Sequence, residues 1–485
     1  MAAVTTSSGR WKLPFTPAAA STAKSARSWS FPRWLTVPFW IVTSALTLAW
    51  VILMLPPAGA AFLAIVGAGV TIWVLVPMIS LYAIVVLSPF EMAYEVGGLN
   101  GVRALDAVIL TLVVVTTGSI LARARGGARF LSPLTRVFMA LWAFLAVWMC
   151  LTFVMGDANR DFLGGPVQNI WYAYRDSLRV LLPFPLLLYC LPDRKAAMRL
   201  VDLLLATTVG IALYGWYQTM VSHASASAPF NTKNALAGYM ILVVPFCVTR
   251  MLFEKNLKKQ AFFAVLLLIL MRVLWLTESR GGLVAFMASM APLILRVPWK
   301  RLLAIGGAGV LALGLFAATR GNILNKPNVQ RFFTLSDPTG QQNFKWRLVQ
   351  WQLIFDKISE SPWIGTGSDI DPELAKMGRL QTAHNGYLGM MLRAGVPASS
   401  TWILLLGLTS LVCLRYVRRA RLPEDLVFWL GMSGSLIALV VHNLNETTLL
   451  MPQIQLVYWA LLAVMLVLVT DKPKPAPAPA RAGRR

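Results

Sequence analysis

Long apolar runs separated by short basic segments constrain this chain more than any other feature of its sequence. A run of about 20 apolar residues is long enough to cross the hydrocarbon core of a bilayer as a helix. Of the 485 residues, 57% are hydrophobic and only 13% are charged, whereas about 25% of the residues in a soluble domain are charged. The pattern therefore predicts an all-α fold, a polytopic bundle of membrane-spanning helices.

The predicted spans are defined by hydropathy, and their ends are set by charged or proline-containing segments. They cover residues 34–55, 60–87, 104–121, 134–155, 178–191, 200–221, 235–253, 262–276, 282–295, 302–318, 401–417, 426–441 and 454–469. The second span is interrupted at Pro77 and is long enough for two passes. We therefore expect about 12 to 14 transmembrane helices, and whether residues 34–87 cross once or three times stays open.

The net charge of +24 comes from the two tails and from short loops, which is the distribution that the positive-inside rule produces. We therefore expect no nucleic-acid partner, and we predict a membrane protein with both tails in the cytoplasm. The loops predicted to be cytoplasmic are 123–136, 193–199, 250–259, 296–301 and 415–421. The connections predicted to face outward are 89–103, 156–175, 222–233, 278–281, 320–383 and 443–453.

One periplasmic connection, residues 320–383, is far longer than the others, and loops of this length are usually functional. It contains the helical pattern "KWRLVQWQLIFDKI" and the aromatic residues Trp346, Trp351 and Trp363. The predicted organisation is a basic cytoplasmic tail (1–33), an N-terminal transmembrane bundle (34–319), a large periplasmic loop with a catalytic motif (320–398), C-terminal transmembrane helices (399–470) and a disordered basic tail (471–485).

Cysteine and acidic residues give little sign of a metal site. The four cysteines all lie in apolar runs and have no metal-ligand spacing, so they are expected to behave as small hydrophobic residues. Asp369, Asp371 and Glu373 in "SDIDPEL" cluster closely enough to hold a divalent ion. The segment lacks the glycine and the final glutamate of a calcium loop, and we predict no metal site.

Polar residues gather at the predicted periplasmic boundary. They are Arg175, Arg179, Lys233, Asn234, Arg280, Arg347 and His384, with Glu446 opposite them in "HNLNETT". Arginine offers a planar fork that matches phosphate oxygens and keeps its charge at any working pH. A single arginine at this depth is often a snorkelling side chain, but the group as a whole predicts a site for a polyanion.

His384 is the candidate proton acceptor. If residues 385–392 are helical, His384 shares a helix face with Tyr387, Leu388 and Met391. An imidazole there could take a proton from an attacking hydroxyl group. A structural histidine is the alternative, and His223 and His442 lie on the same predicted side as rivals.

The segment "AHNGYLGMMLRAG" resembles the signature of the O-antigen ligase and polymerase superfamily. In the ligases, a His-Asn pair is followed by nine residues and Gly-x-x-Gly; here His384 and Asn385 are followed by nine residues and Gly395. The last glycine of the pattern is Ala398 in this chain, which slightly favours the polymerase branch. The segments "TKNALAGY", "ESRGG", "WRLVQW" and "SPWIGTGSD" extend the resemblance over roughly residues 200–469.

The resemblance implies a metal-independent glycosyltransferase of the bacterial inner membrane that needs no cofactor and whose active site faces the periplasm. Its donor would be a glycan linked to undecaprenyl pyrophosphate, and its acceptor would be another lipid-linked glycan or lipid A–core. By motif, His384 matches the catalytic histidine, and Arg280 and Arg347 match the arginines that hold the pyrophosphate. Arg175, Arg179, Lys233, Asn234 and Asn385 would bind substrate.

Two other function classes stay open. A transporter or flippase of the same superfamily would need polar residues at mid-membrane depth on both sides of a path, whereas only Arg272 lies clearly inside a predicted span. A scaffold for other glycan-assembly proteins would keep its function when His384 is replaced. The sugar, the linkage, the acceptor and the oligomeric state do not follow from the sequence.

Overall fold

The structure is a computed structural model. It describes residues 82, 84–90, 132–155, 177–227, 229–230, 232–300, 303, 342–367, 383–420 and 423–471. Every regular element in these residues is a helix, as the hydropathy pattern predicts. The predicted spans 34–55 and 104–121, most of the spans 60–87 and 302–318, the N-terminal tail and the C-terminal tail beyond Asp471 lie outside the described residues.

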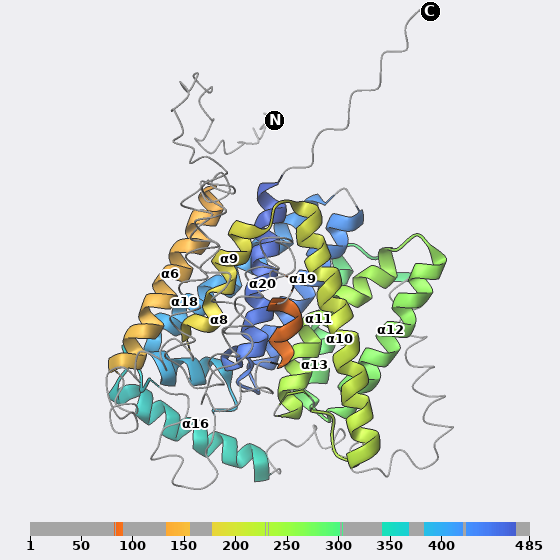
Figure 1. Ribbon diagram of the computed structural model, residues 1–485. Helices are drawn as coiled ribbons and strands as arrows, with labels where there is room; N and C mark the ends of the chain where they lie inside the picture. The colour runs from red at the N-terminus through yellow and green to blue at the C-terminus, as the bar shows by residue number, and fades with distance from the viewer. Residues whose placement is uncertain are drawn as a thin grey trace, which may run out of the picture.

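Figure 1 shows the described helices, coloured in the order in which they follow one another along the chain. They are η1 (Ser88–Phe90), α6 (Pro133–Met155), α8 (Arg179–Leu181), α9 (Pro183–Cys190), α10 (Arg194–Ser222), α11 (Lys233–Phe253), α12 (Leu257–Leu276), α13 (Arg280–Ser289), η4 (Ala291–Leu295), α16 (Gln342–Glu360), α18 (Gly386–Arg419), α19 (Pro423–His442), η7 (Thr448–Leu450) and α20 (Pro452–Thr470).

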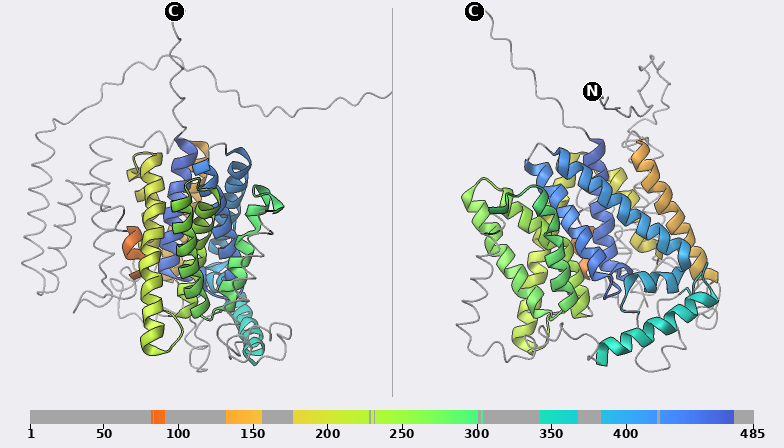
Figure 2. Two further views of the ribbon diagram at one scale, coloured as in Figure 1. Left: turned by 90° about the vertical axis from the view of Figure 1, so that its right-hand side faces the viewer. Right: turned by 180° about the vertical axis from the view of Figure 1, so that it is seen from behind.

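Seven of the described helices are long and apolar enough to cross a membrane: α6, α10, α11, α12, α18, α19 and α20. Helices α11, α19 and α20 are mostly buried and form the centre of the bundle, while α6 and α12 are the least buried of the seven. The views in Figure 2 agree that α6 and α12 lie on opposite sides of this centre. The chain is therefore a multi-pass membrane protein.

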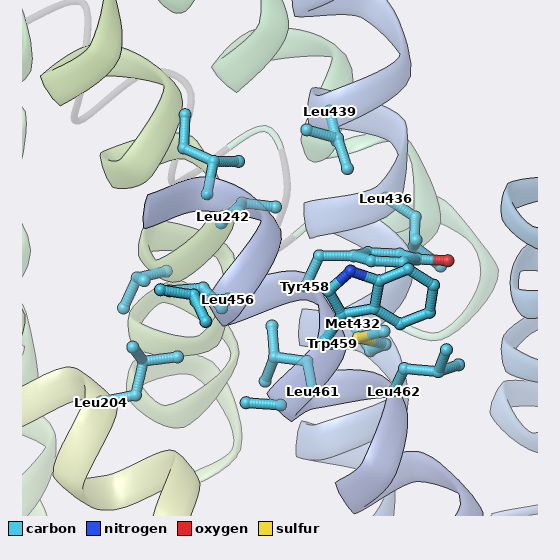
Figure 3. Packing of buried hydrophobic residues seen from close by; sticks show 14 of the residues in the cluster. Leu204, Leu242, Met432, Leu436, Leu439, Leu456, Tyr458, Trp459, Leu461 and Leu462 are labelled. Carbon is cyan, nitrogen blue, oxygen red and sulfur yellow. The ribbon is translucent and has the colours of Figure 1, made fainter. Parts of the chain in front are cut away.

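Aromatic residues fill the middle of the bundle. Trp459 and Tyr458 of α20 are almost fully buried, and the ring of Trp402 from α18 lies 5.0 Å from that of Trp459. Figure 3 shows Tyr458 and Trp459 among Met432 and Leu436 of α19. Lipid tails are as apolar as leucine, so close packing rather than escape from water holds membrane helices together, and large interlocking rings supply many such contacts.

The two ends of the bundle differ in charge, as the loop pattern predicts. At one end, Arg194 at the start of α10 pairs with Asp425 at the start of α19. At the same end, the Arg296 guanidinium donates to the carbonyl oxygens of Val417 and Arg418 at the end of α18, over 2.6 and 2.9 Å. Helix α19 runs from this basic end to the opposite end, and α11 runs the other way, from the opposite end to the basic end. The described basic loops therefore share one end of the bundle.

Two predicted spans are short, interrupted helices. Residues 178–191 form α8 and α9, which are separated at Leu182 and Pro183, because proline lacks the N–H that would continue the ladder. Residues 282–295 belong to α13 and η4, with Pro292 in the first turn of η4. Arg296 reaches the basic end, while Gly281 lies beside His442 at the other end. The pair α13–η4 therefore runs the length of the bundle.

Helix α18 begins much earlier than the predicted span 401–417. It starts at Gly386 and is broken at Gly395, whose φ is +71°, with Pro397 two residues later. Its first segment packs against α16, which lies across the end of the bundle in Figure 1. The histidine motif is therefore joined to a transmembrane helix through a kink instead of standing in a separate loop helix.

Candidate active site

The connection between α19 and α20 forms the base of a polar cluster at the end opposite the basic loops. Asn443 is fully buried. Its side chain donates to the Leu439 carbonyl oxygen over 2.6 Å and accepts from the Leu449 amide over 2.8 Å. Its backbone carbonyl accepts from the Gly386 amide over 2.8 Å. The turn that carries His384 is therefore tied directly to this connection.

Glu446 in that connection joins three side chains from three other parts of the chain. Its Oε1 accepts from Asn234 Nδ2 over 2.8 Å and lies 3.3 Å from Arg347 Nη2. Its Oε2 lies 3.3 Å from His384 Nδ1. Glu446 itself is only 7% exposed, so one buried carboxylate holds an amide, a guanidinium and an imidazole together.

Local structure explains why these side chains meet. Thr232 caps the start of α11 by accepting from the Ala235 amide over 3.1 Å, which places Asn234 in the first turn at the site end. Helix α16 presents Arg347 and Trp351 on one face, and Trp351 Nε1 donates to the Ala383 carbonyl oxygen over 2.9 Å. That bond fixes α16 next to the residue that precedes His384.

His384 lies before α18, and the prediction that it shares a helix face with Tyr387, Leu388 and Met391 is wrong. Asn385 is the N-cap, and its side-chain oxygen accepts from the amides of Tyr387 and Leu388 over 3.0 and 3.1 Å. His384 has a φ of +44°, in the left-handed region. Left-handed backbone outside glycine is concentrated at functional sites, and here it turns the imidazole toward Glu446.

The electrostatics of the cluster favour an ionised Glu446. Burial by itself raises the pKa of the Glu446 carboxyl. The hydrogen bond and the charge of His384, together with the charge of Arg347, outweigh this effect and hold the pKa below its usual value. An ionised carboxylate can only accept hydrogen bonds, so the proton of neutral His384 is on Nδ1 and the lone pair of Nε2 remains for another partner.

A second charged group lies at the start of α13. Lys233 Nζ is 3.4 Å from Glu278 Oε2, and Ser225 Oγ donates to the same oxygen over 3.4 Å. Glu278 also has a left-handed backbone, with a φ of +55°, and it precedes Ser279, which caps α13. Arg280 is the first residue of α13.

The start of α13 borders the connection that carries Glu446. A Cβ atom added to Gly281 would lie 3.4 Å from Cδ2 of His442 and 3.7 Å from Cβ of Asn445. The structure therefore brings together the elements that carry Lys233, Asn234, Arg280, Arg347, His384 and Asn385.

Two predicted substrate-binding arginines are placed differently. Arg179 is 1% exposed, in α8, which packs against α20 and α9. Its side chain is therefore covered by neighbouring helices, and its role in substrate binding stays a prediction. Arg175 lies outside the described residues. Arg272, predicted to lie inside its span, is four residues before the last residue of α12.

The rival histidines have other surroundings. His442 is fully buried, and its Nδ1 is 2.5 Å from Thr448 Oγ1. His223 is the left-handed C-cap of α10. Of the three histidines, His384 is the one in contact with Glu446 while 41% of its side chain is exposed. That combination allows an incoming hydroxyl group to reach the ring.

Residues 361–367 of the segment "SPWIGTGSD" dock on the kink of α18 and explain two glycines of the pattern. The amides of Thr366 and Gly367 donate to the carbonyl oxygens of Leu392 and Arg393 over 2.7 and 2.9 Å. Gly365 and Gly395 both have left-handed backbones, and a Cβ at either would collide with backbone of the other segment. The two segments can approach this closely only because both residues are glycine.

Glu446 is the residue of this cluster that was missing from the predicted site. The sequence analysis noted it only as lying opposite the basic residues. The sequence feature that could have identified Glu446 is a lone carboxylate in a short connection between two apolar spans. Its role could not be read from the sequence because its partners are up to 212 residues away. Among the described residues, no group of three or more His, Cys, Asp or Glu side chains could hold a metal ion; residues 369–373 lie outside them.

Comparison with known families agrees with the geometry. Residues 262–403 match the model of a family described as O-Antigen ligase. The matched segment runs from α12 into α18 and contains Arg280, Arg347 and His384, while Asn234 and Glu446 lie on either side of it. Comparison with curated proteins returns no match. Over residues 262–403, which run from α12 into α18, the chain is therefore similar to the O-antigen ligase family of membrane proteins.

Proposed function

We propose that this protein is a glycosyltransferase of the inner membrane that acts at the periplasmic face. Its donor is a glycan linked to undecaprenyl pyrophosphate. Its acceptor is a hydroxyl group of a second lipid-linked glycan or of lipid A–core. The family match supports a glycosyltransferase-like enzyme of surface-polysaccharide synthesis, and the described basic loops at the opposite end support a site on the periplasmic side.

The observation that carries the proposal is the contact of one buried carboxylate with both His384 and Arg347, each at 3.3 Å. A carboxylate on Nδ1 orients the ring and stabilises the imidazolium that forms when Nε2 takes a proton. The same carboxylate contacts the guanidinium of Arg347 through its other oxygen. Transfer from a pyrophosphate donor requires a base that accepts the acceptor's proton and a cation that binds the leaving pyrophosphate. His384 and Arg347 are candidates for these two roles.

In the proposed step, the acceptor oxygen attacks the anomeric carbon of the donor glycan and forms the new glycosidic bond. The bond between that carbon and the pyrophosphate oxygen breaks, and undecaprenyl pyrophosphate leaves with the bonding electron pair. The acceptor proton moves to Nε2 of His384, a contribution of about 100- to 10,000-fold for general bases. Charges balance because the imidazolium forms as the pyrophosphate gains its charge.

The basic residues act on the leaving group. Arg347 and Arg280 stabilise the charge that develops on the pyrophosphate, an effect worth about 3–4 kcal/mol per donor in comparable sites. Lys233 supports the same anion, and Asn385 contributes through the turn that it caps. Asn234 holds Glu446 over 2.8 Å, so we assign it the role of positioning that carboxylate.

The transporter alternative draws on one observation, the buried cation Arg179 in the apolar helix pair α8–α9. Charged residues inside a membrane bundle often mark a substrate path. In the transferase reading, Arg179 instead supports the architecture around α20. Replacing Arg179 with alanine separates the two: loss of donor translocation with intact transfer from preloaded donor favours transport.

The test is complementation of a strain that lacks this protein by His384→Ala and Arg347→Ala at matched membrane abundance. We expect lipid-linked repeats to accumulate while polymer or capped lipid A–core is lost. His223→Asn is the control, because asparagine tolerates the left-handed backbone at that position. Normal glycan from His384→Ala would remove the histidine from the mechanism and move the transporter and scaffold readings ahead.

The same gels separate the two branches of the family. Single capped repeats on lipid A–core mean that polymerisation has been lost. Bare lipid A–core together with long lipid-linked polymer means that ligation has been lost. Ala398 in place of the last glycine of the signature leads us to expect the first result.

A further inference from the structure

His442 is a buried histidine that has no part in the proposed reaction. It is the last residue of α19, and its side chain is fully buried. Nδ1 lies 2.5 Å from Thr448 Oγ1, while Nε2 has no hydrogen-bond partner among the residues that the structure describes. A buried polar atom without a partner is rare and needs a physical explanation. An apolar side chain of similar size would avoid the unpaired atom, so the ring is there for its contact with Thr448 as well as for its shape.

The backbone of His442 begins the turn that carries Glu446. The carbonyl oxygen of His442 accepts from the amides of Asn445 and Glu446 over 3.1 and 3.0 Å. Two residues after Glu446, the Thr448 hydroxyl group returns to Nδ1 of the same histidine. The turn is therefore closed on His442 at both ends, and the position of Glu446 depends on the position of His442.

The ring of His442 lies beside a glycine on each of two other helices. Helix α19 packs against α11 and α13, which also pack against each other (Figure 1). A Cβ atom added to Gly238 of α11 would lie 3.6 Å from Cε1 of the ring. One added to Gly281 of α13 would lie 3.4 Å from Cδ2 and 3.7 Å from Nε2. The far side of the ring therefore sits next to the backbone of both helices.

These two glycines are close in sequence to residues of the candidate site. Gly238 comes four residues after Asn234, so the two share one face of α11, and Asn234 donates to Glu446 over 2.8 Å. Gly281 directly follows Arg280, the first residue of α13. One ring thus lies against both helices at the level of the residues that hold Glu446 and, in the proposed reaction, the pyrophosphate.

We propose that His442 is a positioning residue for the Glu446 cluster. Its ring sets how closely the turn after α19 approaches α11 and α13, and its Nδ1 contact with Thr448 holds that turn in shape. Glu446 is thereby kept where it contacts His384, and Arg280 is kept at a fixed place beside the cluster. The consequence for glycan transfer rests on the proposed function, whereas the placement of His384 against Glu446 does not.

The first test uses the histidines themselves. The chain has three of them, so the NMR spectrum of full-length protein with isotope-labelled histidine, in nanodiscs, contains three sets of imidazole signals. Neutral His384 should carry its proton on Nδ1, because an ionised Glu446 can only accept there. We expect His442→Asn to shift His384 toward a mixture of both tautomers. His223, the C-cap of α10, should keep its signal and reports on changes of the protein as a whole. An unchanged His384 signal in folded His442→Asn would overturn the proposal, as would equal shifts at His384 and His223.

Two substitutions of similar polarity separate the near side of the ring from its far side. Asparagine places its amide near the position of Nδ1 and leaves the space beside the two glycines open. Glutamine is one carbon longer, so its amide reaches the position of Nε2. We therefore expect His442→Gln to keep most of the wild-type His384 signal and His442→Asn to lose it. The same shift in both variants would show that filling this space does not position Glu446.

A second-site methyl group tests the contact with α13. In the His442→Asn variant, Gly281→Ala adds a Cβ atom toward the space that the ring has left. Gly210→Ala adds one on α10, where nothing lies within 4 Å. The first change should restore part of the wild-type His384 signal and the second should restore none. Equal results from the two double variants contradict a role of His442 in spacing the helices.

The consequence for transfer is measured with lipid-linked repeats extracted from the strain that lacks this protein. We expect kcat/KM of His442→Asn to fall by about 100-fold, as small misplacements of reacting groups do. The KM for the repeats should rise, because Arg280 moves with α13. A smaller amount of folded protein would lower the rate and leave KM unchanged, and that result contradicts positioning. The NMR readout uses no donor. Absence of transfer by the wild-type protein would therefore reject the proposed function, while the inference about His442 stands or falls on the NMR signals.

Discussion

At the scale of single residues, the site depends on how a buried carboxylate is shared. Glu446 contacts Asn234, Arg347 and His384, and its burial keeps water from replacing any of them. A buried charge is costly unless it is paired and hydrogen-bonded. The three partners therefore stabilise Glu446 as much as Glu446 orients them, and a change at any one of the four residues should affect the others.

Replacing Glu446 with glutamine tests the orientation of His384. Glutamine keeps the size but can donate as well as accept, so it no longer specifies a proton on Nδ1. We expect the rate of glycan transfer at saturating donor to fall by about 100-fold or more. Glu278→Gln is the control, since Glu278 pairs with Lys233 and is the comparable carboxylate of the neighbouring pair. An equal, small loss in both variants contradicts the assigned role.

The pH dependence of stability gives a second test of Glu446. Its pKa is lowered in the folded protein, whereas an unfolded glutamate titrates near pH 4.3 or so. The stabilisation is therefore complete above the unfolded pKa and is lost as the pH falls through the lower, folded pKa. We expect the wild-type Tm in detergent to drop more steeply on acidification than that of Glu446→Gln. Parallel curves would show that the cluster does not stabilise the charge.

At the scale of elements, the kink in α18 decides where the His384 motif lies. Gly395 breaks the helix, and residues 362–367 dock on the break through backbone hydrogen bonds. Without the break, residues 386–394 would continue along the transmembrane axis and leave α16. The break therefore holds His384 close to Arg347 on one side and to Glu446 on the other.

Two glycine substitutions in the same helix separate the kink from general helix effects. Gly395→Ala should destabilise the protein by about 1–2 kcal/mol from the left-handed backbone alone, with a further cost from collision with the Trp363 carbonyl. Gly407→Ala meets nothing within 4 Å and should be neutral or stabilising by about 0.5–1 kcal/mol. Unfolding midpoints in detergent titration measure both. Similar midpoints for the two variants would remove the kink as a required feature.

At the scale of the whole molecule, the two ends of the bundle carry different groups of charged residues. Pairs such as Arg194 with Asp425 lie at the basic end, and the Glu446 cluster lies at the other. The connections alternate between the ends along the described chain. Chemistry on a lipid-linked donor needs a site at one membrane surface, and the Glu446 cluster lies at one end of the bundle.

Labelling from each side of the membrane tests the orientation. A cysteine at Gln352 on α16 should react with an impermeant maleimide in intact spheroplasts, where the periplasmic face is exposed. A cysteine at Lys255 between α11 and α12 should react only after the membrane is opened. The native cysteines lie in apolar helices and are expected to be slow to react. The reverse pattern would place the cluster in the cytoplasm and exclude the proposed donor reaction.

Much of the fold could be predicted from local sequence. The spans that became α6, α10, α11, α12, α19 and α20 were predicted because hydropathy over about 20 residues decides whether a segment enters a bilayer. The sharing of one end by the described basic loops follows from charges in the loops themselves. His384 and Arg347 were predicted by the short motifs around them, and the structure brings both to one carboxylate. Their roles in the reaction stay predictions.

What the sequence determined by itself is the membrane-spanning, all-helical character of the chain, the grouping of its basic loops and the family of its motifs, because each depends on residues close together in the chain. Tertiary structure alone decided the break at Gly395, the burial of Arg179, and the choice of Glu446 as the common partner of Asn234, Arg347 and His384. These depend on packing between segments up to 212 residues apart. No local pattern records which carboxylate an imidazole will meet, because that contact exists only once α11, α16, α18 and the connection after α19 have come together.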